Sequence, residues 1–203
     1  MTGSFLRDML RLVARTPLQA LGWLAALIAA GALVDLFLSN PAAASYPGLV
    51  ATFGQFMLTS AALRSVDAHQ AWGRPGRVAS YIVASLIGTV AIFAGFFCLI
   101  LPGLFLYARW STLMPLIIGE GIGVRAAFGT SWRRTARYQW SIMGAVAVTL
   151  GIVCLGVLAF AFYPEFGPPA PLLAILANGL MDLGLILSWY MAVAIHLALE
   201  PDA

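Results

Sequence analysis

Ionisable side chains inside long apolar segments are the residues of this sequence whose chemistry most needs an explanation. Arg109, Asp182 and Asp35 lie in segments that are otherwise almost entirely apolar, and Glu120 closes one of these segments. A charge inside a lipid bilayer is costly, so such residues pair with one another or mark the path of an ion or a substrate. The predicted site contains these four residues and Asn178, which helical spacing places on the same face as Asp182.

We expect Arg109 to form an ion pair with Asp182, with Asp35 as the second choice, and we favour this structural role over a transport path. A path needs more polar groups than these segments hold, and transport sites in membranes usually lie at broken helices. Only Pro115 offers such a break, because it removes the hydrogen bond to the carbonyl of Ser111. A small transporter or channel with a site near Arg109 and Asp182 is the alternative.

Sequence motifs of known enzymes are missing from the chain. There is no G-x-S-x-G, no H-E-x-x-H, no phosphate-binding loop and no His/Ser or Cys/His set suited to nucleophilic attack. Cys98 and Cys154 lie in apolar segments, where thiols behave as small apolar groups, and no Cys/His spacing resembles a zinc site. We therefore expect no enzyme activity, no catalytic residue, no metal and no cofactor. A membrane-embedded lipid enzyme is the least favoured reading.

The composition excludes a soluble globular protein. Of the 203 residues, 62% are apolar and 9% are charged, and the mean hydropathy is +0.93. A soluble domain carries about 25% charged residues, which it needs to cover its surface. All 11 basic residues are arginine, as is typical of a GC-rich bacterial genome. The net charge of +3 does not indicate nucleic-acid binding, because the arginines flank apolar segments.

The apolar segments that position these residues are long enough to cross a bilayer as helices, which takes about 20 residues each. Pro102-Gly103 separates the third from the fourth, because helices rarely continue through such a pair. A re-entrant loop over 79–118 is the alternative there. The predicted fold is a single all-α membrane domain over residues 1–203, with six transmembrane helices and cytoplasmic interfacial helices. The spans are predicted at about 18–38, 46–63, 79–101, 104–119, 140–162 and 172–197.

The arginines predict the orientation of these spans. Ten of them lie in three segments: before the first span, between the second and third, and between the fourth and fifth. Cytoplasmic loops are rich in arginine, so both termini are predicted in the cytoplasm of a bacterial inner membrane. A cleaved signal peptide over 1–44 is disfavoured, because its basic and apolar parts are too long. Each of the three basic segments is followed by two spans, and two explanations of this pattern stay open. One is a threefold repeat, and the other is that any six-span protein needs charged inner loops.

Residues 1–16 predict a helix that lies along the inner membrane interface. Arg7, Arg11 and Arg15 recur every four residues and therefore share one helical face, while apolar residues cover most of the other face. Thr16-Pro17 predicts a break before the first span, because the residue before proline disfavours helical geometry.

The stretch from Leu101 to Met143 resembles a known family. It reads Leu101-Pro102-Gly103, Arg109-Trp110-Ser111, Pro115, Glu120-Gly121, Ala126-Ala127-Phe128, Ser131-Trp132-Arg133 and Trp140, and covers about a fifth of the chain. This order resembles the membrane-domain family related to glycerophosphoryl diester phosphodiesterase, which includes YciC-type bacterial inner-membrane proteins. In some relatives the membrane part is attached to a catalytic phosphodiesterase barrel. We do not expect that activity here, because the acidic and histidine metal ligands of the barrel are missing.

The resemblance adds Ser131 and Trp132 to the predicted site, beside Arg109 and Glu120. Taken together, the sequence features predict a non-enzymatic inner-membrane protein that organises the membrane or binds a lipid or protein partner. The arginine clusters would attract anionic lipid headgroups at the cytoplasmic face, each arginine contributing about 1 kcal/mol. The sequence identifies no protein partner, and we expect no nucleic-acid partner.

Overall fold

The chain folds into helices. The computed structural model describes residues 1–37, 46–66, 77–161 and 171–200, and all regular elements within these ranges are helical. This confirms the all-α class. The helices are α1 (Thr2–Arg15), α2 (Pro17–Phe37), α3 (Tyr46–Arg64), α4 (Arg77–Cys98), α5 (Ile100–Arg109), α6 (Leu113–Pro115), the π-helix η2 (Leu116–Glu120), α7 (Val124–Thr135), the 3-10 turn η3 (Ala136–Tyr138), α8 (Gln139–Ala161) and α9 (Pro171–Ala198).

Several helices have the length and composition of membrane spans. Within the described ranges, five helical stretches are long and apolar enough to cross a bilayer: those of α2, α4, α5 to η2, α7 to α8, and α9. The chain is therefore compatible with a multi-pass membrane protein. The second predicted span coincides with α3, which is less apolar because it includes Thr52, Gln55, Thr59 and Ser60. A sixth span thus stays a prediction.

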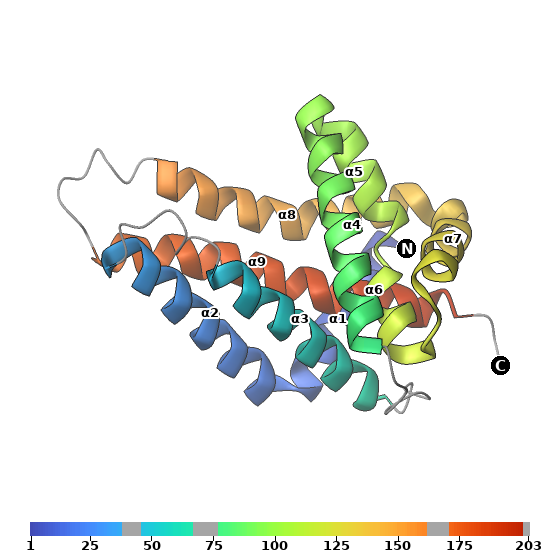
Figure 1. Cartoon of the computed structure of the whole chain (residues 1–203), viewed down its shortest axis with the longest axis horizontal. Helices are drawn as coiled ribbons and strands as arrows, with labels where there is room; N and C mark the ends of the chain where they lie inside the picture. Colours follow the sequence, from blue (N-terminus) through green and yellow to red (C-terminus); the bar gives the residue numbers. More distant parts are fainter. Residues whose placement is uncertain (38–45, 67–76, 162–170, 201–203) are drawn as a thin grey trace.

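The long helices fall into two groups. Helices α2, α3, α8 and α9 run side by side, and α4 and α5 form a hairpin that crosses them (Figure 1). Helices α8 and α9 approach most closely through glycines: a Cβ atom on Gly156 would lie 2.7 Å from the backbone nitrogen of Met181, and one on Gly184 would lie 2.8 Å from that of Val153. Small residues let membrane helices make such close contacts.

The break between the first two helices lies where the sequence predicts it. Helix α1 ends at Arg15, Thr16 has non-helical angles (φ −130°, ψ 49°), and α2 begins at Pro17. The Thr16 hydroxyl lies 2.6 Å from the hydroxyl of Tyr190, which joins this corner to α9. The apolar face of α1 packs on α8 and α9, with the buried residues Phe5, Met9 and Leu12. That face therefore contacts protein, and the position of α1 relative to a membrane stays a prediction.

The turn between α4 and α5 corrects the predicted position of the third hairpin. The chain turns at Leu99, which is extended (φ −169°, ψ 150°), and not at Pro102-Gly103. Pro102 instead occupies the first turn of α5, where a missing N–H costs nothing. Gly103 lies against Phe96, and a Cβ on Gly95 would be 3.0 Å from the Cα of Gly103. The glycine allows the two arms of the hairpin to touch.

The predicted fourth span, 104–119, is not one continuous helix. Helix α5 ends at Arg109, and α6 and η2 follow after a turn at Trp110–Thr112. Gly121 then adopts left-handed angles (φ 67°), which glycine accepts without strain. The helical path is therefore interrupted twice between Arg109 and α7. These two breaks allow Glu120 and α7 to pack onto the bundle.

Candidate functional site

The side chain of Arg109 does not pair with Asp182, and the predicted ion pair between these two described residues is wrong. The Arg109 guanidinium instead lies 4.6 Å from the ring centre of Trp132 and 5.4 Å from that of Phe105. Its Nη1 also donates to the carbonyl oxygen of Trp132 at 3.1 Å. The guanidinium thus lies against aromatic rings and a backbone carbonyl beside the basic helix α7, and its buried Nε has no hydrogen-bond partner among the described residues.

Three hydroxyl groups, here called the hydroxyl cluster, join α7 to the break after α5. Ser131 donates to the carbonyl oxygen of Arg109 at 2.8 Å, and Thr135 donates to the same oxygen at 3.1 Å. Thr112 donates to the Ser131 hydroxyl at 2.9 Å. All three residues are buried. The structure therefore brings Arg109, Ser131 and Trp132 together, and here their contacts hold two helices in place.

The polar residues of α9 lie apart from Arg109. Asp182 has a buried Oδ2 atom with no hydrogen-bond partner among the described residues. Asn178 donates to the carbonyl oxygen of Ala174 at 2.9 Å and packs against Gly31 of α2. Asp35 belongs to α2, but its side chain lies outside the described residues. Among the described side chains, Asp182 and Asn178 form no hydrogen bond or ion pair with Arg109.

Among the predicted site residues, Glu120 lies beside the most side chains that could take part in chemistry. Its carboxylate accepts from Nη1 and Nη2 of Arg134 at 2.5 and 3.3 Å. Nε2 of His196 lies 3.9 Å from Oε1 of Glu120. The ligand atoms of Glu120, His196 and Glu200 all lie within 4.8 Å of one another. We name these three residues the acid–histidine cluster.

Sequence reasoning missed Arg134, His196 and Glu200 as neighbours of Glu120. The spacing of His196 and Glu200 by four residues places them near one face of α9 and its extension, and this signal was available. No pattern connects them to Glu120, which comes from a distant part of the sequence. The η2 turn, which brings Glu120 to the end of α9, was not predicted.

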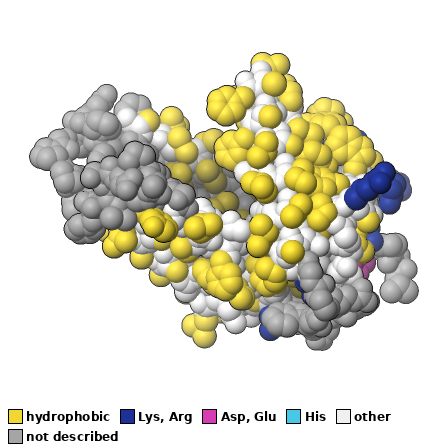
Figure 2. Space-filling view, viewed as in Figure 1, with side chains coloured by type: hydrophobic (Ala, Val, Ile, Leu, Met, Phe, Trp, Pro, Cys, Tyr) yellow, Lys and Arg dark blue, Asp and Glu magenta, His cyan; other side chains and the backbone are white. Residues whose placement is uncertain are grey.

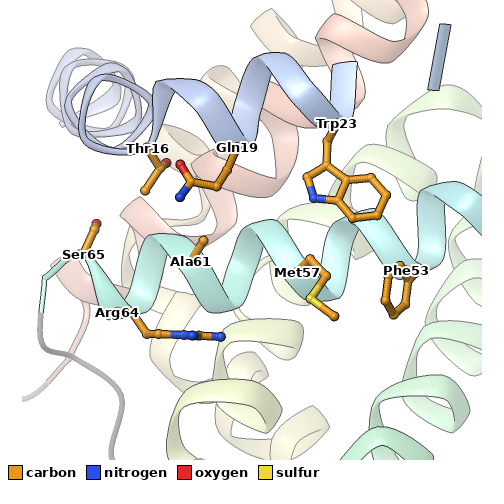
Figure 3. A pocket seen from close by; sticks show the side chains of 8 residues that line it. All are labelled: Thr16, Gln19, Trp23, Phe53, Met57, Ala61, Arg64 and Ser65. Atoms are coloured by element: carbon orange, nitrogen blue, oxygen red, sulfur yellow. The ribbon is translucent and has the colours of Figure 1, made fainter. Parts of the chain in front are cut away.

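A groove between α2 and α3 has a polar end and an apolar end. Its volume is about 550 Å³. Figure 3 shows that Gln19 and Trp23 face it from α2, while Met57 and Phe53 face it from α3. The residues that line it are Thr16, Gln19, Trp23, Phe53, Met57, Ala61, Arg64 and Ser65.

The two ends of the groove differ in chemistry. At one end lie Arg64, the last residue of α3, and Ser65, which follows it. The carbonyl oxygen of Ser65 accepts a hydrogen bond from Nη1 of Arg15 at 3.3 Å. At the other end the rings of Trp23 and Phe53 meet edge to face, with centres 5.6 Å apart. An amphiphilic molecule with an anionic head and an apolar tail matches this order of side chains.

A smaller cavity of about 120 Å³ lies inside the bundle. Polar groups from α3, α4, α9 and the α5–α6 region face it beside Trp110 and Trp189. Near it, the hydroxyl of Tyr81 donates to the carbonyl oxygen of Thr52 at 2.6 Å. The polar lining residues are Gln55, Ser85, Thr89, Tyr107, Ser111 and Ser188.

Comparison with known proteins adds no relative to this description. No protein-family model, no curated protein and no solved structure matches the chain.

Proposed function

We propose that this chain is a non-enzymatic, multi-pass protein of a bacterial inner membrane that binds anionic membrane lipids. The observation that carries the proposal is the groove between α2 and α3, whose basic, polar end continues into an apolar, aromatic end. A phospholipid has the same order of chemistry along its length. The headgroup lies near Arg64 and Arg15, and an acyl chain follows Met57 and Phe53.

The charges around the groove support an anionic headgroup over a neutral one. Arg15 and Arg64 are both exposed, as are Arg7 and Arg11 on α1. Asp8 pairs with Arg11 at 3.0 Å, which leaves a net positive charge on this helix. Basic residues near a membrane surface attract anionic lipids by about 1 kcal/mol each. This attraction raises the local concentration of anionic lipid at the mouth of the groove.

The apolar surface supports a membrane environment for the rest of the molecule. Phe97 is 90% exposed, Ile100 is 74% exposed and Leu99 is 70% exposed, all at the tip of the α4–α5 hairpin. Figure 2 shows that apolar side chains cover this hairpin from its tip down to the body. Soluble proteins rarely expose such a patch. The hairpin and the long helices lie in the bilayer, and the arginine-rich segments face the cytoplasm.

The family resemblance agrees with this role. The resemblance is to a membrane domain related to glycerophosphoryl diester phosphodiesterase. Without the catalytic barrel, such a domain would bind lipids as ligands and would not cleave them as substrates. The motif residues Arg109, Ser131 and Trp132 contact one another, which is what a structural role for the motif requires. That the chain belongs to this family is itself part of the proposal.

The test is lipid retention by the purified protein. Native mass spectrometry of the protein in mild detergent, titrated with phosphatidylglycerol or phosphatidylcholine, should show one tightly held phosphatidylglycerol. Met57→Trp fills the groove and should abolish this retention, and Arg64→Gln should reduce the preference for the anionic lipid. Leu86→Trp, on an exposed position of α4, is the matched control and should bind as the wild type does. Equal retention of both lipids, or equal loss in the control, would refute the proposal.

A small transporter is the second candidate function, and the polar cavity inside the bundle favours it. Its site would differ from the one predicted around Arg109 and Asp182, because Arg109 lies against Trp132. Membrane proteins place polar side chains inside a bundle where a solute or water passes. Solute uptake by vesicles containing the protein, abolished by Ser188→Leu but not by Met57→Trp, would favour this candidate over lipid binding.

A further inference from the structure

The acid–histidine cluster lies at the end of the molecule that holds α7 and the last turn of α9 (Figure 1). Glu120 is the last residue of η2, and the left-handed Gly121 directs the chain away immediately afterwards. His196 belongs to α9, and Glu200 follows one turn later. Two segments that are distant in sequence thus present two carboxylates and one imidazole to a common point.

The imidazole of His196 lacks the partners that a buried polar group normally has. His196 is only 1% exposed, and its buried Nδ1 has no hydrogen-bond partner within the described part of the chain. Its Nε2 points toward Glu120, but the distance of 3.9 Å to Oε1 is too long for a hydrogen bond. Buried polar groups normally have a partner, and a ligand between Nε2 and the Glu120 carboxylate gives Nε2 the one that it lacks.

The spacing of the three side chains matches a metal ion better than a direct contact. Zinc binds His nitrogen and carboxylate oxygen at about 2.0–2.2 Å, so neighbouring ligand atoms around it lie roughly 3.4 Å apart. The three ligand atoms lie within 4.8 Å of one another, and small rotations of the exposed Glu200 close the difference. The 3.9 Å between His196 and Glu120 is already near the required separation.

Arg134 does not compete with a metal for the whole of Glu120. Its two contacts, at 2.5 and 3.3 Å, use one side of the carboxylate, and each oxygen has a further lone pair. Carboxylates that bind metals are commonly held in place by an outer hydrogen-bond donor. Arg134 fills this role and fixes the direction in which Glu120 faces His196.

We infer that Glu120, His196 and Glu200 bind one divalent transition-metal ion of the zinc class. Imidazole favours zinc over magnesium and calcium, and the two carboxylates supply anionic oxygen ligands. Three protein ligands leave one position for water. The ion reaches the site past the exposed Glu200 and ties the end of α9 to η2 and, through Arg134, to α7.

The test is Zn²⁺ binding by the full chain, purified in mild detergent without a histidine tag and freed of metal with a chelator. Titration against a fluorescent zinc indicator should give one Zn²⁺ per chain, and added Zn²⁺ should raise the Tm. Glu200→Gln, at an exposed position, should keep the fold and weaken binding by at least about tenfold. Glu120→Gln should weaken binding as well.

Asp8→Asn is the matched control, because Asp8 lies on α1 outside the cluster. It should bind Zn²⁺ as the wild type does. The inference is wrong if the wild type binds no stoichiometric Zn²⁺, if Glu200→Gln binds with unchanged affinity, or if Asp8→Asn weakens binding as much as Glu200→Gln. Lipid retention does not enter this experiment, so its outcome is independent of the proposed function.

Discussion

The guanidinium of Arg109 lies over the rings of Trp132 and Phe105, at 4.6 and 5.4 Å from their centres. An arginine in an apolar segment needs partners, and this requirement was predicted correctly. The predicted partner, Asp182, was wrong. The true partners are the aromatic rings of Phe105 and Trp132, and a cation–π contact needs no opposite charge.

The acid–histidine cluster could be predicted only in part, for a related reason. His196 and Glu200 are close in sequence, and helical spacing brings them together. Glu120 joins them through tertiary contacts of a short π-helix, and such turns have no strong sequence pattern. Of the three residues, only Glu120 belonged to the predicted site, and local spacing could have linked His196 with Glu200 but not with Glu120.

The contacts of Arg109 predict the outcome of two double-mutant cycles. Arg109→Leu combined with Trp132→Leu should show a coupling of about 0.5–2 kcal/mol, because a cation–π contact joins the two side chains. Arg109→Leu combined with Asp182→Asn should show additive effects, since these side chains form no ion pair. Unfolding of the purified variants, followed by circular dichroism in detergent, measures both couplings. A coupling with Asp182 larger than that with Trp132 would restore the ion-pair hypothesis.

At the scale of helices, the ends of the long elements were predictable to within a few residues. Helix α8 covers Gln139–Ala161 against a predicted 140–162, and α9 covers Pro171–Ala198 against 172–197. Charged residues and helix breakers flank these two apolar segments, so the length of each apolar segment predicts where its helix begins and ends. The hairpin turn and the broken fourth span were not predictable in this way, because the packing of Gly95 on Gly103 and the hydrogen bonds of the hydroxyl cluster decide them.

The packing of α8 on α9 predicts opposite effects for two glycines of the same helix. A Cβ on Gly156 would lie 2.7 Å from the backbone nitrogen of Met181, so Gly156→Ala must push the helices apart. We expect a loss of about 1–3 kcal/mol of stability. Gly151 has nothing within 4 Å of such a Cβ, so Gly151→Ala should be neutral or stabilise by about 0.5–1 kcal/mol. Thermal unfolding of both variants in one detergent makes the comparison, and equal losses would contradict the observed helix contact.

At the scale of the whole molecule, the helices form two groups with different surroundings. Helices α2, α3, α8 and α9 run side by side and the α4–α5 hairpin crosses them, and both groups expose large apolar side chains, such as Leu18 (82%) and Phe97 (90%) (Figures 1 and 2). The composition predicted a membrane protein, and the described helices agree. The orientation of the chain across the membrane is predicted from the arginine pattern, and an experiment can test it.

The arginine pattern predicts the location of the C-terminus. A reporter enzyme fused after Ala203 should be active only if it is a type that works in the cytoplasm, because six spans return the chain to the side on which it began. A second reporter inserted between α2 and α3 should report the opposite side. Periplasmic activity of the fusion after Ala203 would exclude the six-span topology.

The hydrogen bonds on the carbonyl of Arg109 bear on how the chain enters a membrane during synthesis. Both hydroxyls that satisfy this carbonyl, those of Ser131 and Thr135, come from α7, which the ribosome makes after the α4–α5 hairpin. Until α7 emerges, the end of α5 carries an unpaired carbonyl, which is costly in an apolar environment. We therefore expect the hairpin to reach its final position only after residues up to Thr135 have been translated.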